Sequence, residues 1–440
     1  MVMKQQTIFL FKIETTKERL MAHGGLALMA EFNHGIGLRE LTDRYLPVPR
    51  SNRGFDPSVV VDSMVLMLQG GGRSLEDLRE LKDEEGLMRL IGRDEIPEPD
   101  TVGDWLRKMG DPGTGQIGLK GLDRVRGKMN GRILKRDGVK EYTLDADAME
   151  IVGEKADAFF TYRGNKGYMP MLGYLYETPV CIYDEFREGN VAPAYGQREF
   201  YLECKGRMPA GKRIRYYRSD SASYQADLFN QLEADGVKYA ITADQDKAVK
   251  ALIGLLKAEQ WKEPVRGCGY ELAETVHCMN QTKKAFRLVI KREIRRQREL
   301  FGKEGQYFYH AVATNWLEEE KNTQEVLAWH NQRGQAENFN KELKIGLGMQ
   351  RLPAVGRDAL WADPRQCSLF QDRGDCVQSV YWVQTAFLSG VMDETDHSYL
   401  SVEDGAGGGS DRQACWEDSS EINDGCGKIG IISRDQKKVF

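Results

Sequence analysis

The sequence predicts an α/β protein whose sheet-containing part follows an all-α domain. Apolar residues recur at three- and four-residue spacings in the first third of the chain, which is typical of amphipathic helices. Short β-rich runs begin near Val139, and residues 214–242 contain a strand, a helix and a second strand in succession. Such a change of periodicity is expected where one domain ends and another begins.

Residues 1–137 are predicted to form the helical N-terminal domain. The runs at 24–46 and 56–92 have helical periodicity and are interrupted by glycine clusters that are typical of turns. Pro99 marks a further helix start, with Asp100 or the following threonine as the N-cap. Short helices with tight turns permit a helix-turn-helix, so we expect a domain for DNA binding or dimerisation. A plain packing domain fits the same pattern.

Residues 138–243 are predicted to form the first part of an α/β core. Three strands come first, and the strand, helix and strand of residues 214–242 follow them. Residues 244–310 then interrupt the core as a β-rich insertion. Residues 311–353 supply the end of a further strand and a long helix that complete the core. This order of elements is compatible with a ribonuclease-H-like fold.

The helix predicted at residues 328–348 has one polar and one apolar face. At about 100° per residue, its polar side chains leave through a wedge of about 60°; they are His330, Arg333, Glu337 and Lys344. Its apolar side chains form a stripe that faces a core; they are Trp329, Ala336, Phe339 and Leu343. On periodicity alone, the polar wedge is more typical of a solvated face with an Arg333–Glu337 ion pair.

Three further carboxylates fall on the predicted core strands. Asp220 closely follows the strand that begins at Ile214, at the sheet edge where ligands of α/β folds bind. Asp145 and Asp147 lie two residues apart on the first strand, and therefore on one face of it. A loop or a capped turn is the alternative for this segment, because Asp is depleted in strands.

Glu337 lies on the helix face opposite the apolar stripe, so it could complete a carboxylate cluster with Asp147 and Asp220. Three like charges repel one another strongly unless divalent cations lie between them, and carboxylate oxygens suit Mg²⁺ or Mn²⁺. Two such ions about 3.5–4 Å apart stabilise both the attacking and the leaving oxygen in phosphoryl displacement. Arg333 and Lys344, in the same wedge, would bind phosphates beside the metals.

The net charge of −5 hides an uneven distribution. Residues 354–440 contain 15 acidic and 8 basic residues, so the preceding part of the chain carries a net charge of +2. In that part, basic residues cluster at 120–140, 205–218 and 283–299. Each cluster alone is typical of a solvated face, but three clusters flanking one candidate site favour a polyanionic partner.

Composition and cysteine placement exclude several protein classes. No run approaches the ~18–20 apolar residues of a membrane span, and the first residues lack the pattern of a signal peptide. The eight cysteines include no Cys-x-x-Cys pair, which fits a reducing compartment. Cys268, His277 and Cys278 do not have the spacing of a standard zinc site. We therefore expect a cytoplasmic protein without a membrane partner.

Together these motifs resemble the DDE-type transposases of bacterial insertion sequences, in the branch that carries a Tyr-Arg-Glu-Lys signature. Arg333, Glu337 and Lys344 occur at the spacing of that signature. The segments "TLDADAM", "YYRSDSASY" and "AVATNW" resemble the strands that surround the family's catalytic carboxylates. The resemblance covers roughly residues 20–353.

The resemblance implies a ribonuclease-H-like catalytic core that uses two Mg²⁺ or Mn²⁺ ions for cut-and-paste transposition. Asp147, Asp220 and Glu337 would be the catalytic residues and metal ligands. The family's Asp-x-Ser/Thr spacing favours Asp147 over Asp145 as the first carboxylate, with Asp145 as an additional contact of the metal site. Met149 departs from the small hydroxyl residue that is usual two positions after this carboxylate.

The resemblance also implies double-stranded DNA as the partner, both as the terminal inverted repeats of the transposon and as the target. His330, Arg333 and Lys344 would contact this DNA, with His330 as a weaker hydrogen-bond donor where the family usually has Tyr. A homodimer is expected in the DNA complex, in the bacterial cytoplasm and associated with the nucleoid. Two other classes stay open: a ribonuclease-H-like nuclease that cuts without joining, and an inactive relic that only binds DNA.

Residues 354–440 have a composition unlike that of the preceding chain. The family's usual continuation is an apolar helix followed by a basic tail, whereas this segment is acidic, contains "GAGGGS" and holds four of the eight cysteines. We interpret it as an irregular tail produced by a frameshift near Pro353, which would leave the protein unstable or inactive as encoded. A genuine divergent or disordered tail is the alternative.

Overall fold

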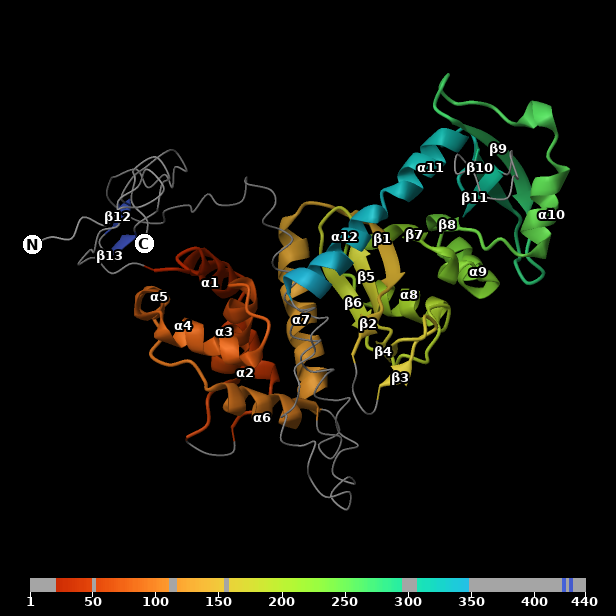
Figure 1. Ribbon diagram of the computed structural model, residues 1–440. Helices are drawn as coiled ribbons and strands as arrows, with labels where there is room; N and C mark the ends of the chain where they lie inside the picture. Colours follow the sequence, from red (N-terminus) through yellow and green to blue (C-terminus); the bar gives the residue numbers. More distant parts are fainter. Residues whose placement is uncertain are drawn as a thin grey trace, which may run out of the picture. The chain divides into compact units, whose positions relative to one another are not determined.

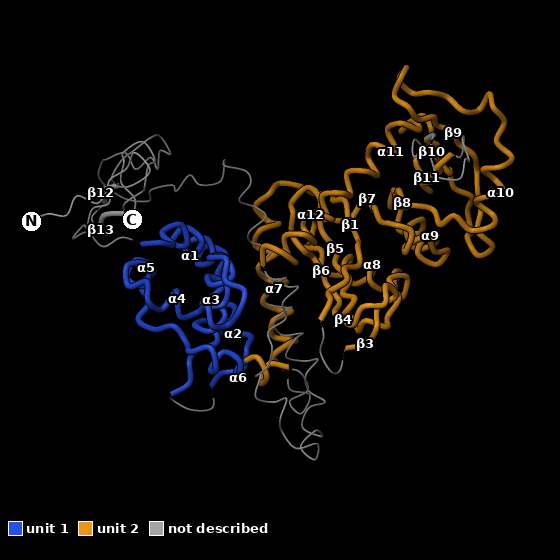
Figure 2. The backbone as a smooth tube through the Cα atoms, in the orientation of Figure 1, with its two compact units in different colours: residues 1–105, 394–440 blue, residues 106–393 orange. Residues whose placement is uncertain are grey.

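The computed structural model describes residues 21–49, 53–110, 117–153, 158–294 and 307–347, and the backbone of two short strands at 422–424 and 427–429 (Figure 1). The chain divides into two compact units, residues 1–105 with 394–440 and residues 106–393 (Figure 2). The predicted domain boundary at residue 137 falls after the long helix α7 (Ile117–Arg136). The division between the units precedes that helix.

The described residues between 21 and 105 are helical, as the sequence predicts. They form α1 (Leu26–Gly35), α2 (Leu38–Tyr45), α3 (Pro57–Gln69), α4 (Leu78–Asp83), α5 (Glu85–Leu90) and the first part of α6 (Pro99–Gly110). Helix α3 has proline at its first position and is buried along nearly its whole length, so it is the centre of this unit. Because α6 begins at Pro99, Asp100 lies in its first turn and is not the N-cap. Within the described chain, no helix is both long and apolar enough to cross a membrane.

One buried carboxylate on α3 joins three segments of this unit. Asp62 accepts a hydrogen bond of 3.4 Å from Asn33 Nδ2, lies 3.4 Å from Arg39 Nε, and pairs with the buried Arg93. A buried charge is tolerated only when it is paired and hydrogen-bonded, and Asp62 meets both conditions. These contacts fix the helices that surround α3.

An eight-stranded sheet forms the centre of the second unit, in the order β6-β5-β1-β7-β8-β11-β10-β9 (Figure 1). The strands are β1 (Glu141–Ala148), β5 (Met171–Leu175), β6 (Cys181–Glu185), β7 (Arg213–Ser219), β8 (Lys238–Thr242), β9 (Tyr270–His277), β10 (Phe286–Ile294) and β11 (Tyr307–Thr314). Strand β5 pairs antiparallel with both β1 and β6, whereas β1, β7 and β8 are parallel. Three antiparallel strands followed by two parallel ones form a ribonuclease-H-like core, which confirms the predicted fold class.

The insertion is β-rich, as predicted, and its strands continue the core sheet. Strand β11 pairs antiparallel with β8, β10 with β11, and β9 with β10. Helix α10 (Lys247–Leu255) lies between β8 and β9 in the sequence. The insertion and the core therefore share one hydrogen-bonded sheet.

Helices and a small second sheet complete this unit. The helices are α8 (Gln197–Gly206), α9 (Ala226–Ala234), α11 (Thr323–Asn331) and α12 (Gly334–Lys341). Val326 and Leu327 of α11 pack on the apolar cluster of β8–β11, with Trp316 and Trp329 at its margin. The small sheet has the order β2-β4-β3, with β2 (Ile151–Val152), β3 (Phe159–Phe160) and β4 (Lys166–Tyr168).

The single helix predicted at residues 328–348 is wrong. Helix α11 ends at Asn331, α12 begins at Gly334, and a π-helical turn follows at Glu342–Gly346. Gly334 weakens helical propensity at the break. A side chain from the sheet also binds the carbonyl of Trp329 in the last turn of α11, which favours an ending there. The regular α-helical hydrogen bonding is therefore interrupted between Asn331 and Gly334.

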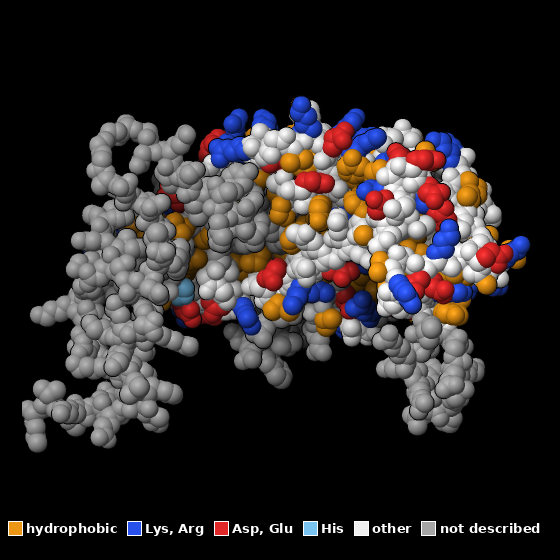
Figure 3. Space-filling view, turned by 90° about the horizontal axis from the view of Figure 1, so that it is seen from above, with side chains coloured by type: hydrophobic (Ala, Val, Ile, Leu, Met, Phe, Trp, Pro, Cys, Tyr) orange, Lys and Arg blue, Asp and Glu red, His pale blue; other side chains and the backbone are white. Residues whose placement is uncertain are grey.

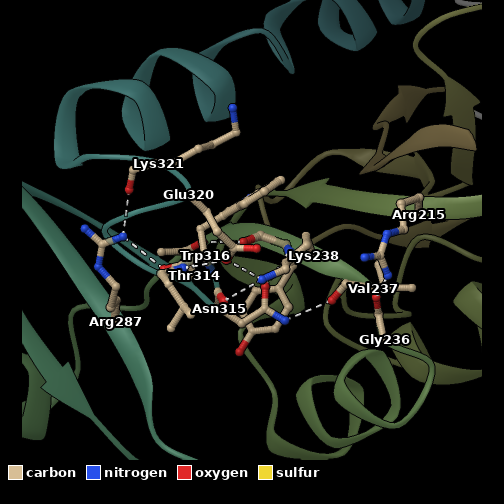
Figure 4. A network of polar contacts seen from close by, with 12 residues as sticks. Arg215, Gly236, Val237, Lys238, Arg287, Thr314, Asn315, Trp316, Glu320 and Lys321 are labelled. Atoms are coloured by element: carbon tan, nitrogen blue, oxygen red, sulfur yellow. Dashed lines mark hydrogen bonds and ion pairs between the residues drawn. The ribbon is translucent and has the colours of Figure 1, made fainter.

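The junction between β11 and α11 is fixed by a network of polar contacts (Figure 4). Asn315 accepts from the backbone of Tyr239 and donates to that of Val237, and Arg287 donates to the carbonyls of Trp316 and Lys321. The Trp316 ring also stacks on Tyr216, with the centroids 5.8 Å apart. Trp316 therefore has a packing role, and Trp261 in the insertion is buried.

Candidate active site

Asp147 lies near the end of β1 and is held by an amide from α12. Asn340 Nδ2 donates to Asp147 Oδ2 at 2.8 Å, and Tyr174 Oη on β5 donates to Asn340 Oδ1 at 3.0 Å. The second contact fixes the orientation of the Asn340 amide, which is buried. A strand and a helix that are distant in the sequence thus meet at this carboxylate.

Asp220 directly follows β7, the parallel neighbour of β1. Its Oδ1 accepts from the backbone nitrogen of Ala222 at 3.0 Å and caps a short 3₁₀ turn at Ser221–Ser223. Because β1 and β7 are parallel, their carboxyl ends lie at the same edge of the sheet. The sheet therefore brings Asp147 and Asp220 together.

The electrostatics of Asp147 link it to both other predicted carboxylates. Burial is the main cause that raises the pKa of Asp147, to about 7, and the charges of Asp220 and Glu337 raise it further. The Arg333 charge and the hydrogen bond from Asn340 oppose this rise. A negative charge raises the pKa of a neighbouring carboxylate appreciably only when the two groups are close together in a poorly solvated site.

Glu337 is less firmly held than the two aspartates. Its side chain, on α12, is 55% exposed and pairs with Arg333 Nη2 at 3.0 Å. No group of three His, Cys, Asp or Glu side chains is arranged to hold a metal ion within the described ranges. The charges of Asp220 and Glu337 act on Asp147, while the Glu337 carboxylate itself is directed to Arg333.

Comparison with known proteins identifies the chain. A profile for the family described as transposase DDE domain group 1 matches residues 10–357, which is most of the chain. The chain belongs to this transposase family. A search of curated proteins gave no match. The cryo-EM structure of a piggyBac transposase synaptic complex with hairpin DNA is similar at a TM-score of 0.43 and 10% identity, covering 86% of this chain and 83% of that chain.

Asp145 occupies a different environment in this transposase, although it shares a strand face with Asp147. Both of its oxygens bind Arg218 of β7, with Nε–Oδ1 and Nη2–Oδ2 distances of 2.7 Å, and both side chains are fully buried. A bidentate pair of this kind is strong and directional. It occupies both oxygens of Asp145.

Arg218 has a structural role that its place in the basic cluster at residues 205–218 does not predict. Its Nη1 donates to the backbone oxygen of Trp329 at 3.0 Å and to Gln332 Oε1 at 3.1 Å. Its guanidinium lies 4.3 Å from the ring centroid of Tyr176 and 5.1 Å from that of Trp329. Arg218 therefore connects β1 and β7 to the break between α11 and α12. The sequence contains one signal for this pair. Arg218 lies two residues before Asp220, just as Asp145 lies two residues before Asp147.

His330, on α11, is buried against the sheet, whereas Glu337, on α12, is exposed. Its Nε2 lies 3.1 Å from Thr242 Oγ1 and 3.3 Å from the backbone oxygen of Ser219, and the side chain is buried. Burial, assisted by the charge of Arg333, lowers the pKa of His330 to about 3. The imidazole is therefore neutral and directed to the sheet.

Arg333 and Lys344 both lie close to the carboxylates. The Arg333 side chain is 24% exposed and lowers the pKa of Asp147. Lys344 belongs to the π-helical turn, and its partial burial lowers its pKa while the charges of Glu150 and Asp147 oppose this effect. The predicted cations are therefore present beside the predicted acids, although they come from two different helical turns.

The three basic clusters contain several residues with structural roles. Arg126 on α7 is fully buried and pairs with the buried Asp184, and Lys212 pairs with Asp137. Arg218, from the second cluster, is also buried. On the face drawn in Figure 3, Lys and Arg side chains alternate with Asp and Glu. The local density of basic residues therefore overstates the positive surface that a polyanion would meet.

Proposed function

We propose that this chain is a transposase that cleaves DNA at transposon ends and joins the freed ends to target DNA. The observation that carries the proposal is geometric: the parallel strands β1 and β7 bring Asp147 and Asp220 to one sheet edge, and Asn340, on the same helix as Glu337, binds Asp147 there. Carboxylates that are held close together with little access to water repel one another, and a bound cation removes this repulsion. Membership of the DDE family supports this interpretation.

Asp147, Asp220 and Glu337 would hold two Mg²⁺ or Mn²⁺ ions. The donor set fits these ions, because all three side chains offer hard oxygen ligands and the charges of Asp220 and Glu337 both act to raise the pKa of Asp147. When bound, such ions activate water and stabilise the leaving oxygen of a phosphodiester. Glu337 must exchange Arg333 for the ions, and its exposure leaves it free to do so.

The neighbouring residues would divide into DNA-binding and positioning roles. Arg333, once released from Glu337, and Lys344 would bind backbone phosphates of the DNA ends. Asp145 would act through Arg218, whose contacts set the position of the α11–α12 break. His330, which the sequence analysis assigned to DNA, would instead support the end of β7 through its contact with the Ser219 carbonyl.

The proposed partner is double-stranded DNA, as terminal inverted repeats and as target, and the proposed assembly on DNA is a homodimer. A strand-transfer assay with pre-cleaved transposon ends separates a transposase from a nuclease, because a nuclease cuts without joining. A wild-type chain that binds end DNA without metal-dependent cleavage would be an inactive relic.

Three charge-neutralising variants test the metal site. Asp147→Asn, Asp220→Asn and Glu337→Gln should each abolish cleavage of end DNA and leave binding nearly intact. Glu318→Gln, an exposed carboxylate in the loop after β11, is the matched control and should retain wild-type cleavage. Near-wild-type cleavage by any of the three variants contradicts its assignment as a ligand.

A thermal-shift titration with Mn²⁺ tests the same site without catalysis. Ions that bind only the folded state raise the melting temperature in proportion to the logarithm of their concentration. The wild type and Glu318→Gln should show this rise, and Asp147→Asn should show a much smaller one. Equal rises in all three proteins would place metal binding elsewhere.

For residues 354–440 we propose a frameshift origin. Apart from the backbone of strands β12 (Ile422–Asp424) and β13 (Gly427–Ile429), this segment lies outside the described residues. The family match ends at residue 357, close to the change in composition at Pro353. Translation of the other two reading frames downstream of codon 353 should yield an apolar helix and a Lys/Arg-rich end. Failure of both frames removes the proposal.

A further inference from the structure

The β3–β4 hairpin carries three exposed aromatic rings. Phe159 is 49% exposed, and Phe160 and Tyr162 are each 64% exposed. Large aromatic side chains are usually buried, so several exposed ones on one short hairpin indicate a binding surface. We call Phe159, Phe160, Tyr162, Arg163 and Lys166 the aromatic hairpin.

Cations lie over two of these rings. Lys166 Nζ is 5.8 Å from the centroid of the Phe160 ring, and Arg163 Cζ is 5.4 Å from that of Tyr162. Arg163 Nε also donates to Tyr162 Oη at 2.9 Å. The surface therefore combines flat apolar rings with positive charge, a combination that suits nucleobases and phosphates.

The hairpin is anchored to the strand that carries Asp147. Glu150, three residues after that aspartate, accepts a hydrogen bond from Thr161 Oγ1, accepts another of 3.3 Å from Asn165 Nδ2, and lies 3.6 Å from Arg163 Nη1. The turn itself is closed by a 2.7 Å bond from Thr161 N to the Asn165 carbonyl. Gly164 adopts a φ of 82°, which a side chain would strain.

Contacts of Glu150 place the hairpin near Asp147, because Glu150 binds Thr161, Asn165 and Arg163 and lies only three residues after that carboxylate. The hydrogen bond to Tyr162 is the main cause that raises the pKa of Arg163, and the charges of Glu150 and Asp147 act in the same direction. A DNA strand whose phosphodiester lies at Asp147 would therefore have the aromatic hairpin close beside it.

We propose that the aromatic hairpin binds unpaired nucleobases of the DNA strand that lies at Asp147. The bases stack on Phe160 and Tyr162, and Arg163 and Lys166 contact the adjoining phosphates. Unpaired bases are the expected ligand because paired ones keep their faces inside the duplex stack. This assignment rests on the proposed function, and it names a contact to the DNA that the carboxylates themselves do not make.

The test compares two DNA ligands with the full-length chain in metal-free buffer. One is a blunt transposon-end duplex, and the other is the same duplex with a four-base single-stranded tail that contains 2-aminopurine. Phe160→Ala and Tyr162→Ala should each weaken binding of the tailed duplex by about tenfold and blunt-duplex binding by less than about twofold. Wild-type protein should quench 2-aminopurine by stacking, and the alanine variants should not.

Conservative variants separate stacking from folding. Tyr162→Phe and Phe160→Trp keep an aromatic face and should keep both tail affinity and quenching. Equal losses for blunt and tailed DNA, or no loss for either, would overturn the proposal. A changed sedimentation state of Phe160→Ala with unchanged tail binding would assign the surface to self-association and overturn it as well.

The outcome is independent of the metal-site test. Glu337→Gln, which should not cleave, should still quench the 2-aminopurine tail like the wild type. If the hairpin variants lose tail binding but keep normal metal-dependent thermal shifts, the result would support base binding by the aromatic hairpin independently of the metal site. Failure of the metal-site variants with intact tail discrimination would count against the proposed chemistry alone.

Discussion

The sheet edge and the helix that face each other at the candidate site hold their carboxylates in different ways. Asp147 and Asp220 follow paired strands and each accept a hydrogen bond from a fixed donor. Glu337 lies just after a helix break, is mostly exposed, and forms an ion pair at the surface. The sheet thus provides two carboxylates with fixed hydrogen-bond donors, and α12 provides a third whose side chain is exposed and paired only at the surface.

The buried Asp145–Arg218 pair is the firmest connection between the two regions. Arg218→Ala should destabilise the protein by about 3–5 kcal/mol, because it leaves the carboxylate buried without its partner. The double variant Asp145→Leu with Arg218→Met removes both charges and should recover much of that loss. Urea unfolding of the single and double variants measures the difference. A loss below about 1 kcal/mol for Arg218→Ala would mean that the pair does not hold β1, β7 and α11 together.

The burial of Asp147 beside two other acids should appear as a pH-dependent loss of stability. Its pKa is raised to about 7 in the folded state, so the protonated form stabilises the fold at low pH and this contribution is lost as pH rises through 7. Without divalent ions, Asp147→Asn should therefore be more stable than wild type at pH 8, on the order of 1–3 kcal/mol. The two proteins should converge below about pH 4. Parallel stability curves over this range would show that Asp147 is not strained.

The cations on the helical side should contribute to DNA binding through their charge. Arg333→Ala and Lys344→Ala should each reduce the slope of log affinity against log salt by about 0.9. The exposed Lys250 on α10 provides a control, and Lys250→Ala should leave the slope unchanged. Unchanged slopes in both test variants would assign Arg333 and Lys344 to structural ion pairs.

Gly334→Ala tests the break between α11 and α12 and should have the smallest effect of these variants. A Cβ at this position meets no atom within 4 Å, and the residue opens α12. The variant should gain about 0.4–1 kcal/mol of stability, because alanine restricts the unfolded chain. If cleavage slows in this more stable variant, motion at the break contributes to catalysis. Unchanged cleavage would show that rotation of the Glu337 side chain is sufficient.

The sheet could be predicted well because strand patterns are local. Alternation places Asp145 and Asp147 on one face, and the run before Asp220 ends where the β7 strand ends. The helical side was predicted poorly because its break depends on a distant residue. Arg218 binds a carbonyl of α11 that lies 111 residues further along the chain, and no periodicity within the helix records that contact.

Tertiary contacts also explain the other differences between the predicted and the observed site. His330 fits a polar wedge only on an uninterrupted helix, and the break directs it to the sheet instead. Asn340 was missed because an amide is ordinary on a helix surface, although its spacing of three from Glu337 places both on one face. Counting charges could not separate the buried Arg126 and Arg218 from exposed basic residues, because burial depends on tertiary packing.

The pairing of β11 with β8 has a mechanical consequence. Three residues of each strand, from Thr242↔Val312 to Ala240↔Thr314, join the antiparallel strands β9–β11 to the parallel strands β7 and β8. A hydrogen-bonded sheet bends and twists as a continuous layer, so the two parts cannot hinge freely at this seam. A displacement of β9–β11 would therefore be transmitted as torsion through β8 to β7, the strand that ends just before Asp220.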